Sequence, residues 1–208
     1  MRRSGGSATL ETSPAPGGPD APARHRHPLP GRLAETLEHA EALDPGVERL
    51  AAVSRPLLAH RGVAELLQGR PLGHAAHPLL TDLPLGLWLS SVTLDLTGGR
   101  DTRAAADRLL GLGVLSVLPV TLTGLADWAL GDQRVRRVGV VHAGLNSVAT
   151  TGFATSWLLR RRGHRTAGVV TSLLAAGALG AAGFLGGHLA FRRQSPRPDA
   201  ADPGATHS

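Results

Sequence analysis

Four long apolar stretches constrain this chain more than any other feature of its sequence. Each is about 20 residues long, which is the length an α-helix needs to cross the hydrocarbon core of a bilayer. The stretches are 78–97, 109–130, 138–159 and 167–191. The last contains no charged residue from Ala167 to Phe191. Because a membrane span must satisfy its own backbone hydrogen bonds, the sequence predicts four transmembrane helices.

The connectors between these stretches are short and basic. Residues 98–108, 131–137 and 160–166 each contain at least three arginines. Short connectors force neighbouring helices to run antiparallel. The fold class we expect is therefore all-α, with a four-helix transmembrane bundle over 71–191. A soluble bundle of very apolar helices is the alternative, and the uncharged last stretch argues against it.

Polar regions flank the predicted membrane domain on both sides. Residues 1–31, rich in proline, glycine and serine, and residues 192–208 are expected to be disordered tails. Between the first tail and the bundle, 32–43 and 46–68 carry apolar residues at helical spacing, and Pro56 should kink or interrupt the second helix. These juxtamembrane helices, over 32–70, either lie as amphipathic helices on an anionic membrane surface or pack as a soluble pair on the loops.

Composition excludes several classes of function. The 208 residues include no cysteine, which rules out disulfides, zinc fingers, iron–sulfur ligation and a thiol nucleophile. The net charge of +6 comes from arginines grouped between apolar stretches, as in membrane-flanking loops, so we expect no nucleic-acid partner. The chain has no HExxH, GxSxG or Gly-rich phosphate-binding motif, and an enzyme is not expected.

Titratable side chains gather at one end of the predicted bundle, which we call face A. Antiparallel helices bring the starts of the first and third spans and the ends of the second and fourth to the same membrane surface. The polar residues at this level are His74, His77, Asp82, Asp127, His142, Asn146 and His188. Asp95 lies at the opposite end, face B, where we expect an ion pair with Arg100 or Arg103.

Polar groups inside spans are costly and are functional candidates by default, and three interpretations of this cluster stay open. A b-type haem or another metal would be bound by His77, His142 and His188, of which His142 and His188 form the best pair. The residues that would orient those rings are His74, Asp82, Asp127 and Asn146. A purely structural hydrogen-bond cluster is the second interpretation, in which Asp82 caps the first helix. Proton or small-solute handling is the third.

Four motifs taken together resemble a bacterial membrane family. They are GHAAHPLLTDLPLGLW at 73–88, GLADW at 124–128, HAGLN at 142–146 and GGHL at 186–189. The set is similar to the signature of the DUF2231 domain of unknown function, with Ala75-Ala76 in place of the usual Pro-Leu. The resemblance covers about residues 55–191 and implies a four-span membrane protein. Some relatives resemble fusions to Rieske-type iron–sulfur domains, which would imply a redox context.

These observations leave two functions to be compared. One is a redox component of the bacterial cytoplasmic membrane that binds haem b or a metal and works with a redox partner protein. The other is a structural, anchoring membrane subunit whose polar cluster only holds the helices together. Besides the lipid bilayer, a second copy of the chain is a candidate partner. Arginines divide almost equally between the two faces, so we place both termini in the cytoplasm only because a long N-terminal segment is awkward to export.

Overall fold

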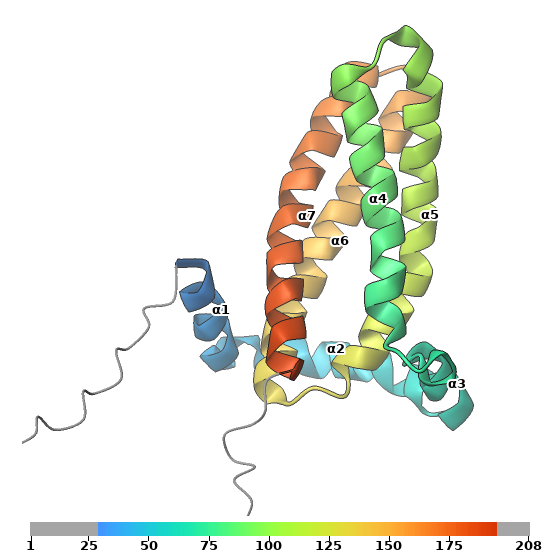
Figure 1. Cartoon of the computed structure of the whole chain (residues 1–208). Helices are drawn as coiled ribbons and strands as arrows, with labels where there is room; N and C mark the ends of the chain where they lie inside the picture. Colours follow the sequence, from blue (N-terminus) through green and yellow to red (C-terminus); the bar gives the residue numbers. More distant parts are fainter. Residues whose placement is uncertain (1–28, 195–208) are drawn as a thin grey trace, which may run out of the picture.

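The computed structural model describes residues 29–194, and all regular secondary structure in that range is helical, with no strand (Figure 1). The expected disordered tails lie outside the described residues except at their inner ends. There, residues 29–31 begin the first helix and residues 192–194 end the last one.

Four long helices run side by side and form what we call the α4–α7 unit. They are α4 (Ala76–Thr97), α5 (Arg103–Trp128), α6 (Gln133–Arg161) and α7 (Arg165–Gln194). α4 packs mainly on α5 and α6 on α7, and α5 also contacts α6. The turns after α4 and α6 lie at one end of the unit, and the turn after α5 lies at the other (Figure 1). The helices are therefore antiparallel to their neighbours in the chain.

Three segments of residues 29–194 have the length and apolar composition of membrane spans. They are Ala76–Thr97, Arg100–Trp128 and Arg165–Ala190. α6 is as long as its neighbours but carries more polar side chains, which lower its mean hydropathy. By composition, then, the structure offers three candidate spans where the sequence predicts four.

The N-terminal helices lie at the face A end of the long helices. They are α1 (Leu29–His39), α2 (Asp44–Leu58) and α3 (Arg61–Leu67). α1 and α2 contact α6, while α2 and α3 contact α5. Three short 3-10 helices connect the elements at Glu41–Leu43, Arg70–Leu72 and Arg100–Thr102.

The helix expected over 46–68 is divided in two. Pro56 lacks a backbone N–H and destabilises a continuing helix, and α2 ends at Leu58. The chain is extended at His60, with φ −99° and ψ 112°, before α3 begins at Arg61. α2 and α3 therefore point in different directions across the end of the α4–α7 unit.

An aromatic pair lies at the centre of the α4–α7 unit. Trp88 of α4 stacks on Phe153 of α6, with ring centroids 4.3 Å apart, and Leu110 of α5 is fully buried beside them. A side chain at Gly113 would overlap the Trp88 indole, so this glycine lets α5 approach α4 closely. This core sets the register of the helices and thereby positions the polar residues at both ends.

Candidate functional site

His142 of α6 is held at both ring nitrogens. Its Nδ1 lies 2.9 Å from the carbonyl oxygen of Ala182 on α7, and its Nε2 lies 3.0 Å from the side-chain nitrogen of Asn146. A carbonyl can only accept, so the network assigns the ring proton to Nδ1 and makes Nε2 an acceptor. A Cβ at Gly186 would lie 3.0 Å from the ring, which shows how closely α7 approaches here.

His77 of α4 has an arrangement that matches His142. Its Nδ1 lies 3.0 Å from the carbonyl oxygen of Val120 on α5, and its ring covers Gly124, where a Cβ would lie 2.8 Å away. In both cases the accepting carbonyl stands four residues before the covered glycine. The structure thus gives His77 and His142 matching contacts with a neighbouring helix, and Asn146 binds the His142 ring.

His188 bonds to a different element. Its Nε2 lies 2.8 Å from Oε1 of Glu38 on α1, and both side chains are largely buried. His142 and His188, the best ligand pair by sequence, therefore sit on adjacent helices but hold different partners. Sequence reasoning missed Glu38, because nothing in the chain marks α1 as the helix that packs beside α7.

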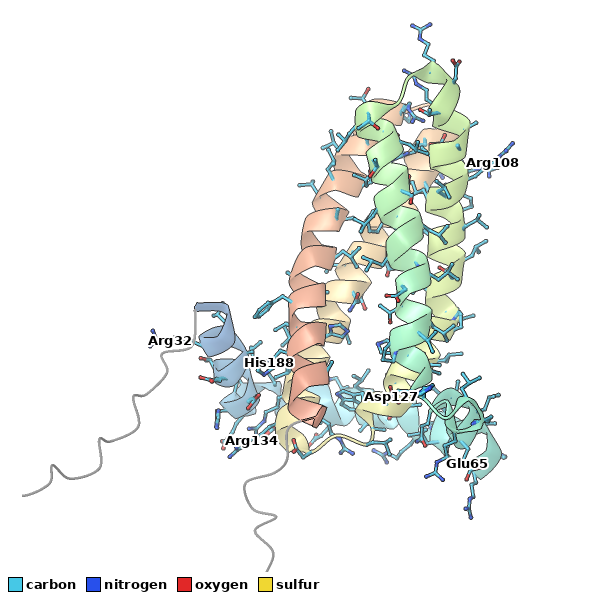
Figure 2. All side chains as sticks on the ribbon, viewed as in Figure 1. Arg32, Glu65, Arg108, Asp127, Arg134 and His188 are labelled. Atoms are coloured by element: carbon cyan, nitrogen blue, oxygen red, sulfur yellow. The ribbon has the colours of Figure 1, made fainter. Side chains whose placement is uncertain are left out.

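The remaining predicted residues divide into two kinds. His74 and Asp82 are exposed and lie outside the cluster. Asp82 does not cap the first helix, because α4 begins at Ala76 and its N-cap is Ala75. Asp127 is buried near the end of α5, and Figure 2 shows it at the same end of the unit as His188. It follows Gly124 by three residues, so it shares the α5 face that His77 covers.

A second polar cluster occupies face B. Arg160 of α6 and Arg165 of α7 each form an ion pair with Asp95 of α4 at 2.6 Å, and both also reach Oδ1 of Asp107 on α5, at 3.2 and 3.0 Å. The side chains of Asp95 and Arg160 are 1% and 0% exposed. Four helices are therefore joined by one network, buried at Asp95 and Arg160 and partly exposed at Asp107 and Arg165, which we call the face B network.

The prediction that Asp95 pairs with Arg100 or Arg103 is wrong. Both lie exposed in and after the turn that follows α4, whereas the Asp95 carboxylate is turned into the interior. Among residues 29–194, the arginines that reach it there come from α6 and α7. Proximity along the chain suggested the nearest cations, but the relative rotation of packed helices decides the pairing.

Serine hydroxyls complete the surroundings of Arg160. Its Nε donates to Ser156 Oγ at 3.2 Å and its Nη2 donates to Ser172 Oγ at 2.9 Å. Ser156 Oγ in turn donates to the carbonyl of Gly168 at 2.6 Å. A buried guanidinium needs this degree of pairing to offset its desolvation. Ser156 and Arg160 stand at i and i+4 on the last turns of α6, and that spacing is the signal in the sequence that points to this site.

A third set of contacts fixes α1 and α2 to the start of α6. Arg137 donates from Nε and Nη2 to the two carboxylate oxygens of Asp44, at 2.7 and 2.8 Å, and from Nη1 to the Glu38 carbonyl at 3.2 Å. Gln133 also donates to Asp44, at 2.7 Å. Hydrogen bonds from Arg137 and then Gln133 lower the pKa of Asp44. The hydrogen bond to Asp44 in turn raises the pKa of Arg137.

Taken together, face A is a set of internal hydrogen bonds. Within residues 29–194, no three histidine or carboxylate side chains are placed to hold one metal ion. His142 would have to give up Asn146 before its Nε2 could bind iron, and His188 would have to release Glu38. As arranged, these residues do not fit a haem ligand set.

The long apolar helices and the buried polar groups at their ends define a class, that of helical membrane proteins. The family described as "Predicted membrane protein (DUF2231)" matches residues 73–195, and this chain belongs to it. The matched region contains α4–α7 and leaves α1–α3 outside. No curated protein and no solved structure gives a significant match.

Proposed function

We propose that this protein is a four-span membrane anchor that holds its N-terminal helices as a fixed platform at face A. The observation that carries the proposal is the two-pronged bond of Arg137 to Asp44, which joins α2 to the first turns of α6. The Glu38–His188 contact fixes α1 to α7 in the same way. Apolar helices outside the platform would then serve chiefly to place it at the bilayer surface.

Connectivity supports α6 as the fourth span. The start of α7 lies beside the end of α4 and the start of α5, because Arg165 contacts both Asp95 and Asp107. At the other end, the indole of Trp128 donates to the Arg136 carbonyl and joins the end of α5 to the start of α6. If α4, α5 and α7 cross the bilayer, α6 must carry the chain back across it. Its interior polar side chains, such as Asn146, are then shielded by the other helices.

Single cysteines test this topology directly, because the chain has none of its own. Exposed positions are Gly99 in the α4–α5 turn, Arg134 at the start of α6 and His164 in the α6–α7 turn. We expect Gly99→Cys and His164→Cys to react with an impermeant thiol reagent from one side of the membrane and Arg134→Cys from the other. Labelling of His164→Cys and Arg134→Cys from the same side would mean that α6 does not cross. We place face A and both termini on the cytoplasmic side. The same experiment tests this orientation, because Arg134→Cys should then be labelled from the cytoplasmic side.

The platform presents exposed apolar side chains, which suit it to contact with a partner protein. Val53 of α2 and Val63 and Leu66 of α3 are all exposed. A photo-crosslinking amino acid at Val53 or Leu66 should capture a discrete partner in cells, and Asp44→Ala in the same chain should reduce that product by loosening α2. A crosslinker at lipid-facing Leu115 of α5 is the matched control. Equal capture of the same product at Val53, Leu66 and Leu115 would overturn the proposal that α2 and α3 form a platform for a partner.

A haem- or metal-binding redox role for His77, His142 and His188 stays a prediction, as do a redox partner and a homo-oligomer. An absorption spectrum of the detergent-purified protein, oxidised and then reduced, discriminates it from the anchor. We expect no Soret band after expression with added haem, because the imidazole contacts are already internal. A Soret band that His142→Ala removes would establish the redox role instead.

A further inference from the structure

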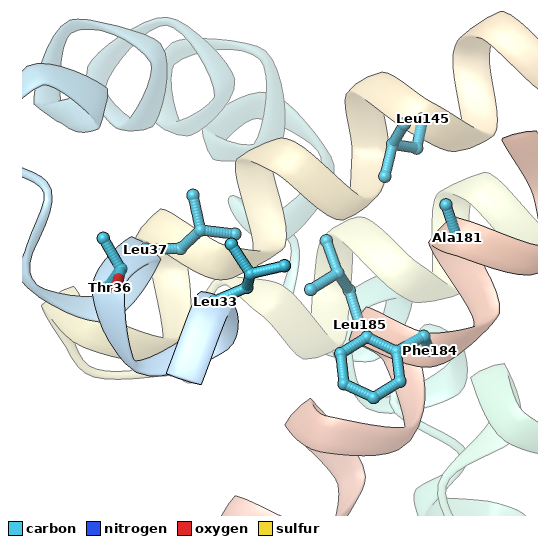
Figure 3. A pocket seen from close by; sticks show the side chains of 7 residues that line it. All are labelled: Leu33, Thr36, Leu37, Leu145, Ala181, Phe184 and Leu185. Atoms are coloured by element: carbon cyan, nitrogen blue, oxygen red, sulfur yellow. The ribbon is translucent and has the colours of Figure 1, made fainter. Parts of the chain in front are cut away.

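An apolar groove opens between α1 and the long helices α6 and α7 (Figure 3). Its volume is about 370 Å³. The apolar residues that line it are Leu33, Leu37, Leu145, Ala181, Phe184 and Leu185. Thr36 is the one polar residue on its wall.

The groove exists because α1 touches the long helices along one edge only. Ala34 is fully buried and packs with Val138 of α6 and Leu185 of α7, and Glu38 is held by His188 one turn later. Leu33, next to Ala34 in the chain, is 65% exposed. α1 therefore contacts the long helices along its Ala34–Glu38 edge, and its Leu33 side stands away from α7. No described residue of this chain fills the space between that side of α1 and α7.

The wall on α7 belongs to a candidate membrane span. Ala181 and Phe184 lie within Arg165–Ala190 and are exposed. They continue an exposed face that includes Leu174 and Gly177, farther from the face A end. In the proposed four-span arrangement that face meets lipid, so the groove is a branch of the lipid-facing surface and opens toward acyl chains.

We propose that the acyl chain of a membrane phospholipid occupies this groove, an inference that rests on the proposed membrane placement. If water filled the groove, its two apolar walls would lose hydrophobic burial and dispersion contacts. An acyl chain in the groove provides both. Arg32 is exposed one turn before Thr36 on α1 (Figure 2), and the Thr36 hydroxyl bonds its carbonyl at 2.8 Å. Its guanidinium is suited to a headgroup phosphate, which arginine binds through paired hydrogen bonds. The lipid thus acts as packing between α1 and the spans.

Nitroxide labels on single cysteines identify what fills the groove. Leu33→Cys reports on the groove and Leu174→Cys, 73% exposed on α7, reports on the open lipid face. In phospholipid vesicles we expect molecular oxygen to reach both labels and a water-soluble nickel chelate to reach neither. Nickel access at Leu33→Cys would mean water in the groove. Access of neither probe there would mean that protein covers it, either residues 1–28 or a second copy. Both results overturn the proposal.

The control label separates this failure from a failure of the membrane placement. If the nickel chelate reaches Leu174→Cys, α7 does not face lipid, and the anchor proposal falls together with the groove lipid. If Leu174→Cys behaves as expected and Leu33→Cys does not, only the groove lipid is wrong.

A filling substitution tests occupancy independently. The probe is phosphatidylcholine with a photoactivatable group on its acyl chain, and the readout is lipid crosslinked to the α1 peptide that contains Leu37. Ala181→Trp should abolish these products because its indole takes the place of the chain. Leu174→Trp, on the same helix outside the groove, should retain them. Equal crosslinking in the two variants would overturn the proposal.

Discussion

At the scale of single residues, Arg160 is a charged side chain that the structure buries completely. Its guanidinium is fully buried and contacts two carboxylates and two serine hydroxyls. Each partner comes from a different part of the chain, so one side chain connects all four long helices. Its removal leaves the Asp95 carboxylate, itself 1% exposed, with Arg165 as its remaining cation.

We expect Arg160→Met to destabilise the protein by about 3–5 kcal/mol, the range for breaking a buried ion pair. Resistance to unfolding by a denaturing detergent is the measurement. The double variant Asp95→Leu/Arg160→Met should lose less than Arg160→Met alone, because it leaves no buried carboxylate without its partner. Arg162→Met, at an exposed position next to the network, is the control and should change stability by no more than about 0.5 kcal/mol. This account would be contradicted if Asp95→Leu/Arg160→Met were less stable than Arg160→Met.

Asp44 gives the platform a pH dependence whose sign follows from its pKa. Hydrogen bonds from Arg137 and Gln133 lower that pKa below its usual 3.8 in the folded protein. A carboxylate with a depressed folded-state pKa stabilises at pH above its ordinary pKa, and this contribution fades as pH falls through the lower, folded-state value. Below about pH 4 the α2 attachment should therefore weaken.

Hydrogen exchange of the α1 and α2 amides, compared at neutral and acidic pH, measures that change. We expect exchange to rise on acidification relative to α5, after correction for the intrinsic rate. In Asp44→Asn the protection should already be lower at neutral pH and should change less with acid. Protection in the unaltered chain that is the same above and below pH 4 would contradict the assigned role of Asp44.

At the scale of helices, glycines decide how closely the pairs pack. A Cβ at Gly124 would lie 2.8 Å from the His77 ring, whereas a Cβ at Gly177 would meet nothing within 4 Å. The same substitution should therefore have opposite effects at the two positions. Gly124→Ala should destabilise by about 1–3 kcal/mol through overpacking. Gly177→Ala should be neutral or stabilise by up to about 1 kcal/mol, because alanine favours helix.

Thermal unfolding of the two variants in one detergent measures this contrast. Gly124→Ala should also change the rate at which a histidine reagent modifies His77. Gly177→Ala should leave that rate unchanged. Equal melting temperatures for the two variants would mean that the His77 ring yields freely, and that its bond to the Val120 carbonyl does not hold it.

Much of the helix layout could be predicted from the sequence, and the contacts between helices could not. The stretch 78–97 corresponds to α4 at Ala76–Thr97, because apolar length and flanking breakers are local properties. The level of His77 and His142 follows from antiparallel connection alone. The partners of Asp95 and His188 depend on the rotation of each helix about its axis and on where α1 packs. No local pattern encodes either of these.

At the scale of the whole molecule, two parts of different character are joined at face A. The α4–α7 unit contains the Trp88–Phe153 core, the face B network and the region matched by the family. The N-terminal helices add contacts to the unit but contribute no residue to that core. The unit should therefore fold without them.

A chain that begins at Arg70 should insert into membranes and resist extraction by alkaline carbonate. Its tryptophan emission should match that of the full-length protein, because Trp88, Trp128 and Trp157 all lie in the α4–α7 unit. It should be less stable than the full chain, since Val138 and Leu185 lose the cover of Ala34. Aggregation of the shortened chain under conditions where the full chain is soluble would show that the two parts fold as one.

The face B network also sets an order of events during synthesis. Asp95 is made 70 residues before Arg165. A ribosome that adds about 5–20 residues per second needs roughly 4–14 s to cover that distance. Until Arg160 and Arg165 are made, α4 has an acidic group near its end and neither of the cations that will pair with it. In the proposed four-span arrangement, we therefore expect the α4–α5 hairpin to keep Asp95 in contact with water at the membrane surface until the α6–α7 hairpin arrives.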